Sequence, residues 1–343
     1  MRSDGDIQMG TCHLMRCLAL GQAWQDAGGQ VIFMTAVRNS ALKARLEAEG
    51  MRVAQPVANP GSDGDALQTV QLGRRLGSSW VVVDGYHFNS RYQALIKEAG
   101  LKLLYIDDDV HVEHYYADLV LNVNLHARPE LYARRESYTL LLLGSQYALL
   151  RREFEPWRQW QREINPNARR ILVTMWGADH DNATARVLQA LEGVGLSGLE
   201  ITVILGGAYP HRRQLEKILR KCRHSVHLEQ NVMQMTEIMA WADLAISAGG
   251  GTCWEMAFMR LPNLILVLAE NQRPIAEHLD NRGIAVNLGW HRDFLSQELQ
   301  KWVIRLLNSP RERAARGNRG RELVGGKGGS RVVAAMLEVQ RND

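Results

Sequence analysis

The chain has 343 residues, of which 46% are hydrophobic and 23% are charged, and its net charge is +4. This composition excludes disordered and fibrous chains, and the length predicts two domains. The mildly basic balance suits an anionic small molecule, whereas nucleic acid is not expected because no basic stripe with interleaved aromatic residues occurs. We expect neither a membrane-spanning helix nor a signal peptide.

The four cysteines are scattered without the paired spacing of a metal site: Cys12, Cys17, Cys222 and Cys253. Unpaired thiols are the rule in reducing compartments. The cysteine pattern therefore predicts reduced thiols and a cytoplasmic protein.

The first element in chain order is a glycine turn at Gly10, which leads into a helical pattern from Leu14 to Trp24. This order places His13 at, or just inside, the N-terminus of a helix. The positive end of a helix disfavours imidazolium, so His13 is a candidate for a neutral base that accepts a proton from water or a hydroxyl. The stretch alone leaves a capping or packing role for His13 open.

A glycine turn before a helix normally follows a buried strand, but the residues before Gly10 are mostly polar or small. Arg2, Ser3 and Asp4 are hardly typical of a strand. Two interpretations remain: the first strand is absent, or the true start of the chain lies further upstream.

Four short apolar runs, separated by helical patterns, follow in the first half: residues 31–34, 80–84, 103–107 and 119–122. Continuous apolar runs of this kind are typical of a parallel sheet that is covered by helices on both faces. Asp84 and Tyr86 come at the end of one run. We therefore expect them at the carboxyl edge of the sheet, where such sheets bind ligands.

A second series of apolar runs begins after the Trp- and Arg-rich residues 151–162: residues 170–174, 201–205, 226–228, 244–247 and 264–268. The sequence therefore predicts two doubly wound α/β domains that face each other across a cleft. Their expected boundaries are residues 1–150 and 151–343, and the last helix is a candidate for packing back on the first domain.

A glycine-rich loop follows the run 244–247 and precedes a helical pattern. The loop consists of Gly249, Gly250, Gly251 and Thr252. Consecutive glycines let backbone amides approach an anion, and the helix N-terminus adds a favourable dipole, so the loop predicts a diphosphate site. Glu255, in the first helical turn, can accept hydrogen bonds from ribose hydroxyls. A tight turn without a ligand is the alternative.

Two further turns follow apolar runs of the second half. Gly177 and Asp179 come after the run 170–174, and a helix cap is the simpler role for Asp179. Asn271 and Gln272 open the helix after the run 264–268, where their amides can bind a sugar or a base. Capping is again the alternative for Asn271.

The acidic triplet Asp107, Asp108 and Asp109 is followed by His111 and Glu113. This pattern fits an Asp-x-Asp metal site, but a turn at the end of a strand explains it more simply. We therefore expect no metal.

Several of these stretches match one known family in order and spacing along nearly the whole chain: residues 10–16, 83–86, 106–108, 117–122, 147–154, 177–179, 247–255 and 271–283. The chain resembles the UDP-2,4-diacetamido-2,4,6-trideoxy-β-L-altropyranose hydrolases of pseudaminic acid biosynthesis. That resemblance implies the glycosyltransferase B fold, with two Rossmann-like domains.

The resemblance also implies a reaction that needs no metal or cofactor. A UDP-linked amino or deoxy sugar is hydrolysed at its anomeric carbon–oxygen bond with inversion, which releases UDP and the free sugar. In this reading His13 is the general base, and Tyr86 and Asn271 contact or orient the sugar. The implied substrate-binding residues are Gly10, Arg16, Asp84, Gly177, Asp179, Gly249, Gly250, Gly251, Thr252, Glu255 and Gln272.

Two alternatives stay open. A glycosyltransferase of the same fold would use the base on an acceptor hydroxyl instead of water, and a non-catalytic relative would only bind the nucleotide sugar. The sequence identifies neither the sugar nor the oligomeric state.

Overall fold

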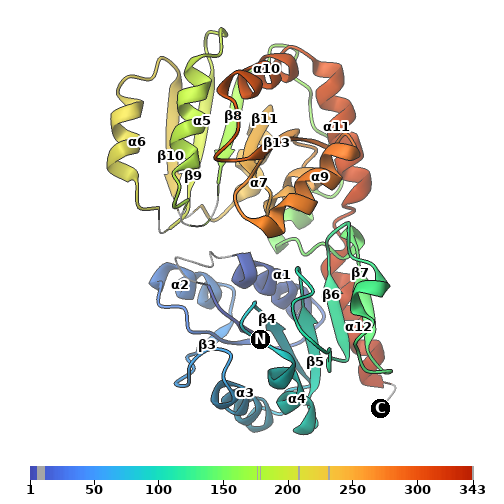
Figure 1. Cartoon of the computed structure of the whole chain (residues 1–343). Helices are drawn as coiled ribbons and strands as arrows, with labels where there is room; N and C mark the ends of the chain where they lie inside the picture. The colour runs from blue at the N-terminus through green and yellow to red at the C-terminus, as the bar shows by residue number, and fades with distance from the viewer. Residues whose placement is uncertain (6–11, 176, 178, 208, 231, 342–343) are drawn as a thin grey trace. The chain divides into compact units, whose positions relative to one another are not determined.

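The computed structural model describes residues 1–5, 12–175, 177, 179–207, 209–230 and 232–341 (Figure 1). The chain divides into two compact units. Unit 1 consists of Met1–Arg152 and Gly326–Asp343, and unit 2 consists of Glu153–Gly325. The C-terminal segment, which the sequence boundary assigned to the second domain, is therefore part of unit 1.

Unit 1 is built on a seven-stranded sheet in the order β3-β2-β1-β4-β5-β6-β7, in which all neighbours are parallel. Its strands are β1 (Arg2–Ser3), β2 (Ile32–Met34), β3 (Arg52–Ala54), β4 (Trp80–Asp84), β5 (Lys102–Ile106), β6 (Leu119–Asn122) and β7 (Leu140–Leu143). The strand order reverses between β1 and β4. Sheets of this kind bind ligands beyond the carboxyl ends of the strands at such a reversal.

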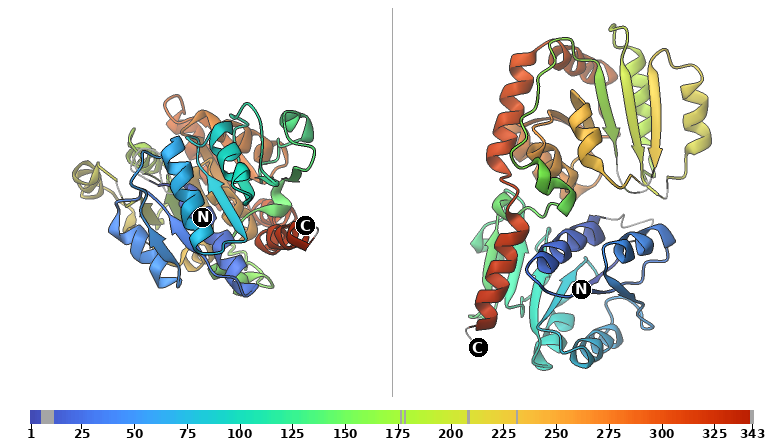
Figure 2. Two further views of the ribbon diagram at one scale, coloured as in Figure 1. Left: turned by 90° about the horizontal axis from the view of Figure 1, so that it is seen from below. Right: turned by 180° about the vertical axis from the view of Figure 1, so that it is seen from behind.

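Helices cover both faces of this sheet (Figures 1 and 2). On one face, α3 and α4 pack on β4 and β5 around Val83 and Tyr105, and on the other face α1 packs against β4 and α12. The helices are α1 (Cys12–Asp26), α2 (Ser40–Ala48), α3 (Asp63–Arg75), α4 (Ser90–Glu98) and α12 (Gly328–Arg341), with short 3₁₀ turns η1 (Pro129–Tyr132) and η2 (Ser145–Tyr147). A third 3₁₀ turn, η3 (Arg152–Trp157), begins at the last residue before unit 2.

The first strand is present, which corrects the expectation that it is missing. β1 is only two residues long, yet it lies in the middle of the sheet between β2 and β4. The sequence did not indicate β1 because its residues are polar. The Arg2 side chain is nevertheless fully buried, and it donates to both carboxylate oxygens of Asp65 in α3. A buried charge is tolerated in a strand when such a partner neutralises it.

Unit 2 has a six-stranded parallel sheet in the order β10-β9-β8-β11-β12-β13. Its strands are β8 (Arg170–Thr174), β9 (Glu200–Leu205), β10 (Ser225–Gln230), β11 (Leu244–Ala248), β12 (Asn263–Val267) and β13 (Ala285–Trp290). The order reverses between β8 and β11. The predicted ligand turns at residues 177–179 and 249–251 follow these two strands.

The helices of unit 2 are α5 (Ala183–Glu192), α6 (Arg212–Leu219), α7 (Met235–Trp241), α8 (Thr252–Phe258), α9 (Arg273–Asn281), α10 (Ser296–Leu307) and α11 (Pro310–Leu323), with the short turn η4 (Glu270–Gln272). Apolar residues of α5, α6 and α10 pack on one face of the sheet and form the main core. Residues on β11 and β12 are buried throughout, as expected for strands covered on both faces.

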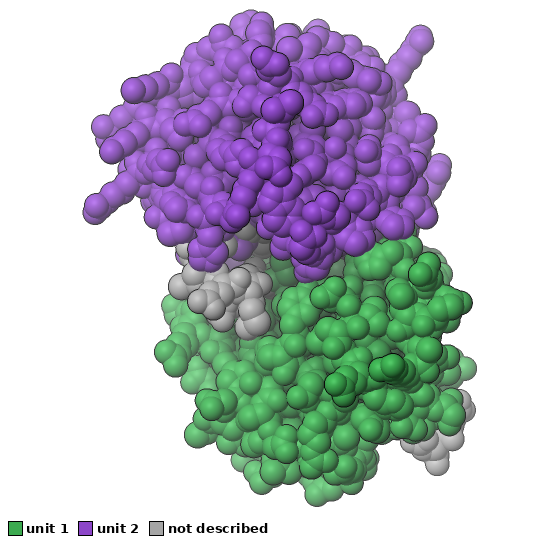
Figure 3. Space-filling view, in the orientation of Figure 1, with its two compact units in different colours: residues 1–152, 326–343 green, residues 153–325 purple. Residues whose placement is uncertain are grey.

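The prediction of two doubly wound parallel-sheet domains is confirmed. The edge strands β3 and β7 and the outer strand β13 were not predicted. The chain passes from one unit to the other after Arg152 and again after Gly325. Figure 3 shows the two units in different colours. Within the described residues, every helix is too short or too polar to cross a membrane.

Candidate functional site

The candidate base lies at the strand reversal of unit 1. α1 begins at Cys12, so His13 occupies the first helical turn, as the sequence predicts. Its Nδ1 lies 2.7 Å from Oδ1 of Asp84, the last residue of β4. Asp84 is fully buried, and the His13 side chain is 6% exposed.

Asp84 is ionised at neutral pH. Burial alone would raise its pKa, but the neighbouring charges of Arg16 and His13 and their hydrogen bonds lower the pKa to about 2. Nη2 of Arg16 also lies 3.1 Å from Nδ1 of His13, but it donates to Asp84 at the shorter distance of 2.6 Å. A carboxylate can only accept hydrogen bonds, so we assign the proton of a neutral His13 ring to Nδ1, which faces Asp84. Nε2 then carries a lone pair, and it has no hydrogen-bond partner among the residues that the structure describes.

Arg16 lies one turn further along α1 and binds two carboxylates. Its Nε and Nη2 donate to the two oxygens of Asp84, each at 2.6 Å, and its Nη1 donates to Asp108 at 2.6 Å. Arg16 was predicted to bind substrate. The structure places its guanidinium in two ion pairs inside unit 1, where it holds the carboxylate that orients His13, and its contact with substrate stays a prediction.

Tyr86 is brought together with His13 as well. The two rings meet edge to face, with their centroids 4.8 Å apart, and the Tyr86 hydroxyl lies 3.4 Å from Oδ2 of Asp108. Tyr86 is 38% exposed, so its ring is accessible. Sequence reasoning did not group Asp108 with this site, and its only signal was that Asp108 follows β5. Gly10 lies outside the described residues.

The acidic triplet after β5 forms a closed turn. Asp107 accepts hydrogen bonds from the backbone of Asp109 and Val110 and, at 2.6 Å, from the Tyr115 hydroxyl. Its other neighbour is His111, with 3.5 Å between Nδ1 and Oδ1. The described part of the chain contains no group of three His, Cys, Asp or Glu side chains that could hold a metal ion.

The glycine loop of unit 2 connects β11 to α8. Gly249 is buried, and its N–H donates to Oε1 of Gln272 at 3.2 Å. At Gly250 and Gly251 a Cβ would meet no atom within 4 Å, so the loop borders open space there. Their backbone N–H groups have no hydrogen-bond partner among the described residues. Both amides are therefore available to an anion.

The residues predicted around this loop have different roles. Thr252 and Glu255 are buried in the first turn of α8. Gln272 also accepts from the N–H of Leu268 at 3.0 Å, so its side chain ties the glycine loop to the end of β12. Asn271 lies next to Gln272 in η4 and is half-buried.

The turn after β8 lies at the same edge of the sheet. Asp179 has a φ of +45°, and its carboxylate caps α5 by accepting from Ala183 at 2.7 Å and from Thr184 at 2.9 Å. The structure thus shows the capping role for Asp179. A Cβ at Gly206 would lie 1.7 Å from the carbonyl oxygen of Gly177, so these two turns touch through their backbones.

Comparisons with known proteins agree with this architecture. Residues 182–322 match the glycosyltransferase family 28 C-terminal domain, a range that includes the glycine loop, Glu255, Asn271 and Gln272. Among solved structures, MurG of Acinetobacter baumannii superimposes with a TM-score of 0.67 and 14% identity over 98% of this chain and 99% of that one. The rhamnosyltransferase SpnG gives 0.64 and 15% over the same shares of the two chains. The fold is the glycosyltransferase B fold.

Three relatives are similar in sequence. An uncharacterized protein of Methanocaldococcus jannaschii is 27% identical over 79% of this chain and 56% of its own length. The spore coat polysaccharide biosynthesis protein SpsG of Bacillus subtilis is 26% identical over 72% of each chain. A Helicobacter pylori protein named as a pseudaminic acid cytidylyltransferase and UDP-2,4-diacetamido-2,4,6-trideoxy-β-L-altropyranose hydrolase is 24% identical over 66% of this chain. The alignment spans 41% of that bifunctional protein's length.

Proposed function

We propose that this chain hydrolyses a UDP-linked amino or deoxy sugar at the anomeric carbon–oxygen bond with inversion, releasing UDP and the free sugar. The observation that carries the proposal is the 2.7 Å hydrogen bond between His13 and Asp84. A buried carboxylate that fixes one ring nitrogen of a histidine leaves the other nitrogen as a proton acceptor.

In the proposed reaction, Nε2 of His13 accepts a proton from water while the water oxygen bonds to the anomeric carbon. The bond from that carbon to the diphosphate oxygen breaks, and its electron pair leaves with UDP through an oxocarbenium-like state. Asp84 stabilises the imidazolium that forms. Tyr86 contacts the sugar beside His13.

Unit 2 binds the UDP part in this proposal. The amides of Gly250, Gly251 and Thr252 meet the charge that grows on the departing diphosphate. Glu255 accepts hydrogen bonds from the ribose, and Asn271 contacts the sugar. The match of residues 182–322 to a glycosyltransferase C-terminal domain supports this division of roles.

The Helicobacter pylori relative supports a hydrolase of pseudaminic acid-type biosynthesis, because its name includes that hydrolase activity. The proposed reaction needs no metal and no cofactor. We place it in the cytoplasm because the scattered cysteine pattern of the sequence favours a reducing compartment.

The decisive experiment measures UDP release from a panel of UDP-sugars without acceptor and without metal. We expect turnover of at least one amino or deoxy sugar. His13→Ala should lower kcat about 10²- to 10⁴-fold, because general-base assistance is worth that much, and should leave UDP affinity nearly unchanged. His227→Ala, which removes an exposed histidine of β10, serves as the control. Unchanged turnover in His13→Ala would contradict the proposal.

A glycosyltransferase is the second candidate, and the family 28 match and the likeness to MurG and SpnG favour it. The same base would then deprotonate an acceptor hydroxyl. A transferase releases little UDP without acceptor, whereas a hydrolase puts oxygen from solvent on the anomeric carbon. Labelled water therefore distinguishes the two, and UDP binding without any turnover would indicate a non-catalytic binding protein.

A further inference from the structure

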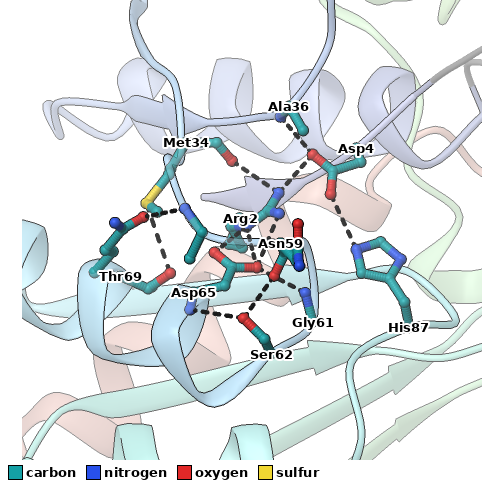
Figure 4. A network of polar contacts seen from close by, with 12 residues as sticks. Arg2, Asp4, Met34, Ala36, Asn59, Gly61, Ser62, Asp65, Thr69 and His87 are labelled. Atoms are coloured by element: carbon teal, nitrogen blue, oxygen red, sulfur yellow. Dashed lines mark hydrogen bonds and ion pairs between the residues drawn. The ribbon is translucent and has the colours of Figure 1, made fainter.

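A second histidine–aspartate pair lies at the same edge of unit 1. It belongs to a buried polar network around Arg2 (Figure 4). The Arg2 side chain is fully buried, with Asp65 on one side and Asp4 on the other, at 2.9 Å and 2.5 Å. Gly61 donates its backbone N–H to Asp65 at 2.8 Å. Every charge of the network therefore has a partner.

Asp4 holds the ring of His87. One oxygen of Asp4 accepts from Arg2 and, at 2.6 Å, from the backbone N–H of Ala36, and the other lies 2.9 Å from Nε2 of His87 (Figure 4). Burial would raise the pKa of Asp4, but the hydrogen bonds from His87 and Arg2 hold it well below its usual range. Asp4 is thus a carboxylate, and Nε2 of His87 donates to it.

The other nitrogen of His87 is left as an acceptor. In neutral imidazole only one nitrogen carries a proton, so Nδ1 has a lone pair when Nε2–H donates to Asp4. Among the residues that the structure describes, Nδ1 has no hydrogen-bond partner. The His87 side chain is 23% exposed, whereas Asp4 is 5% exposed.

Each of the two histidines pairs with the aspartate at the end of the neighbouring strand, not of the strand that precedes it in the chain. Ser3 of β1 pairs with Asp84 of β4, so Asp4 and Asp84 end adjacent strands. The carboxylate at the end of β4 holds His13, which follows β1, and the carboxylate after β1 holds His87, which follows β4. Asp4 is one residue beyond the partner of Asp84, and successive side chains of a strand point to opposite faces of the sheet. The two histidine–aspartate pairs therefore lie on opposite faces at the same edge of the sheet.

Stability alone is a weak explanation for this network. Removing an arginine and two carboxylates from water costs about as much as their attraction returns, so buried ion networks add little net stability. What the network does is fix one imidazole ring and one tautomer at the ligand edge. His87 also follows Tyr86, whose ring contacts His13.

We propose that His87 is a substrate-contacting residue whose Nδ1 accepts a hydrogen bond from a hydroxyl or amide N–H of the sugar, and that Asp4 is its positioning residue. This inference rests on the proposed function. The contact selects sugars that carry a donor at that position, because a site built to pair a donor discriminates against analogues that lack it.

Two variants of His87 distinguish a hydrogen bond to the substrate from a purely structural role of this residue. His87→Gln keeps an N–H near Nε2 that can donate to Asp4 but removes the acceptor at Nδ1. His87→Asn keeps an acceptor close to Nδ1 but loses the contact with Asp4. We expect His87→Gln to lower kcat/KM about 10- to 100-fold, mainly through KM, with an unchanged melting temperature. His87→Asn should retain more of the activity. A merely structural role predicts the opposite order.

Binding measurements separate this inference from the proposed function. Calorimetry gives the ratio of the affinities for a UDP-sugar and for UDP, which does not depend on turnover. We expect His87→Gln to lower that ratio about tenfold. If the wild-type protein binds UDP-sugars and this ratio stays the same in His87→Gln, the role of His87 is wrong and the proposed function stands. If no UDP-sugar binds, both fail.

The tautomer provides a readout without substrate. Nitrogen-15 NMR of the His87 ring should show Nε2–H in the wild-type protein and a shift toward Nδ1–H in Asp4→Asn, where the amide can donate to Nε2. Nδ1–H in the wild-type protein would overturn the inference.

Discussion

His13 and Asp84 are 71 residues apart in the sequence and are joined by a 2.7 Å hydrogen bond between Nδ1 and Oδ1. Their meeting follows from the topology of unit 1. β1 and β4 are adjacent parallel strands, so the helix that leaves β1 begins beside the residue that ends β4. The pair combines a helix N-terminus and a buried carboxylate around one imidazole.

Asp84→Asn should lower kcat about 10²- to 10⁴-fold, because an amide at this position favours the wrong tautomer of His13. UDP affinity should change little. The matched control is Asp108→Asn, which removes an ion pair of Arg16 without touching the hydrogen bond to His13. Steady-state UDP release measures both variants. Equal losses in the two would show that Arg16 pairing, not the orientation of His13, is what matters.

The stability of unit 1 should depend on pH through Asp84. Its folded-state pKa of about 2 lies below the ordinary value of 3.8, so its contribution is fully present above the ordinary value. That contribution, about 2 kcal/mol, is lost as the pH falls from about 5 toward 2. Urea unfolding at several pH values measures this effect. The difference in the free energy of unfolding between the wild type and Asp84→Asn should become smaller as the pH falls through this range. Glu47→Gln, at an exposed ion pair, should show no comparable narrowing.

Gly250→Ala and Gly251→Ala test the diphosphate site directly. A Cβ at either position meets no protein atom, so the melting temperature should not change. The added methyl would occupy the space that the proposed diphosphate needs, and UDP affinity should fall at least tenfold, about 1.4 kcal/mol. Gly195→Ala, which also meets no atom, should leave UDP affinity as it is. Calorimetric titration with UDP measures these affinities. If Gly250→Ala and Gly251→Ala bind UDP as tightly as the wild type does, the diphosphate binds elsewhere.

Arg162→Met should destabilise unit 2 by about 2–4 kcal/mol. The half-buried Arg162 side chain donates to the carbonyls of Met239 and Ala242 at the end of α7 and to that of Met259 after α8. Methionine would leave these buried carbonyls without a hydrogen-bond donor. One such unsatisfied group costs about 1–3 kcal/mol of folding free energy. Arg212→Met removes an exposed ion pair with Glu216 and an exposed hydrogen bond to Gln230, and its unfolding midpoint in urea should stay near that of the wild type.

The sheets could be predicted from sequence because their central strands are buried on both faces and form continuous apolar runs. β1 could not, because its buried side chain is Arg2, and one of the two carboxylates that neutralise it, Asp65, lies 63 positions away in α3. The edge strands β3 and β7 are short and partly exposed, so they lack the same signal.

The candidate site shows the same difference between local contacts, which a sequence can indicate, and contacts between distant segments, which it cannot. The capping role of Asp179 depends on residues four and five positions away, and the sequence analysis favoured this role for the residue taken by itself. The support that Gln272 gives to Gly249, and that Arg16 gives to Asp84, depends on contacts between distant segments. Residue type and spacing predicted which turns lie at the carboxyl edges of the two sheets, but not which side chains in those turns bind one another.

The position of α12 has a consequence for the order of folding. Unit 2 is one continuous stretch, Glu153–Gly325, whereas unit 1 is completed by a helix from the end of the chain that packs on α1. During synthesis, unit 2 has its full sequence before unit 1 does. On the ribosome, α1 and its first-turn histidine therefore lack their covering helix until residues 328–341 have been synthesised.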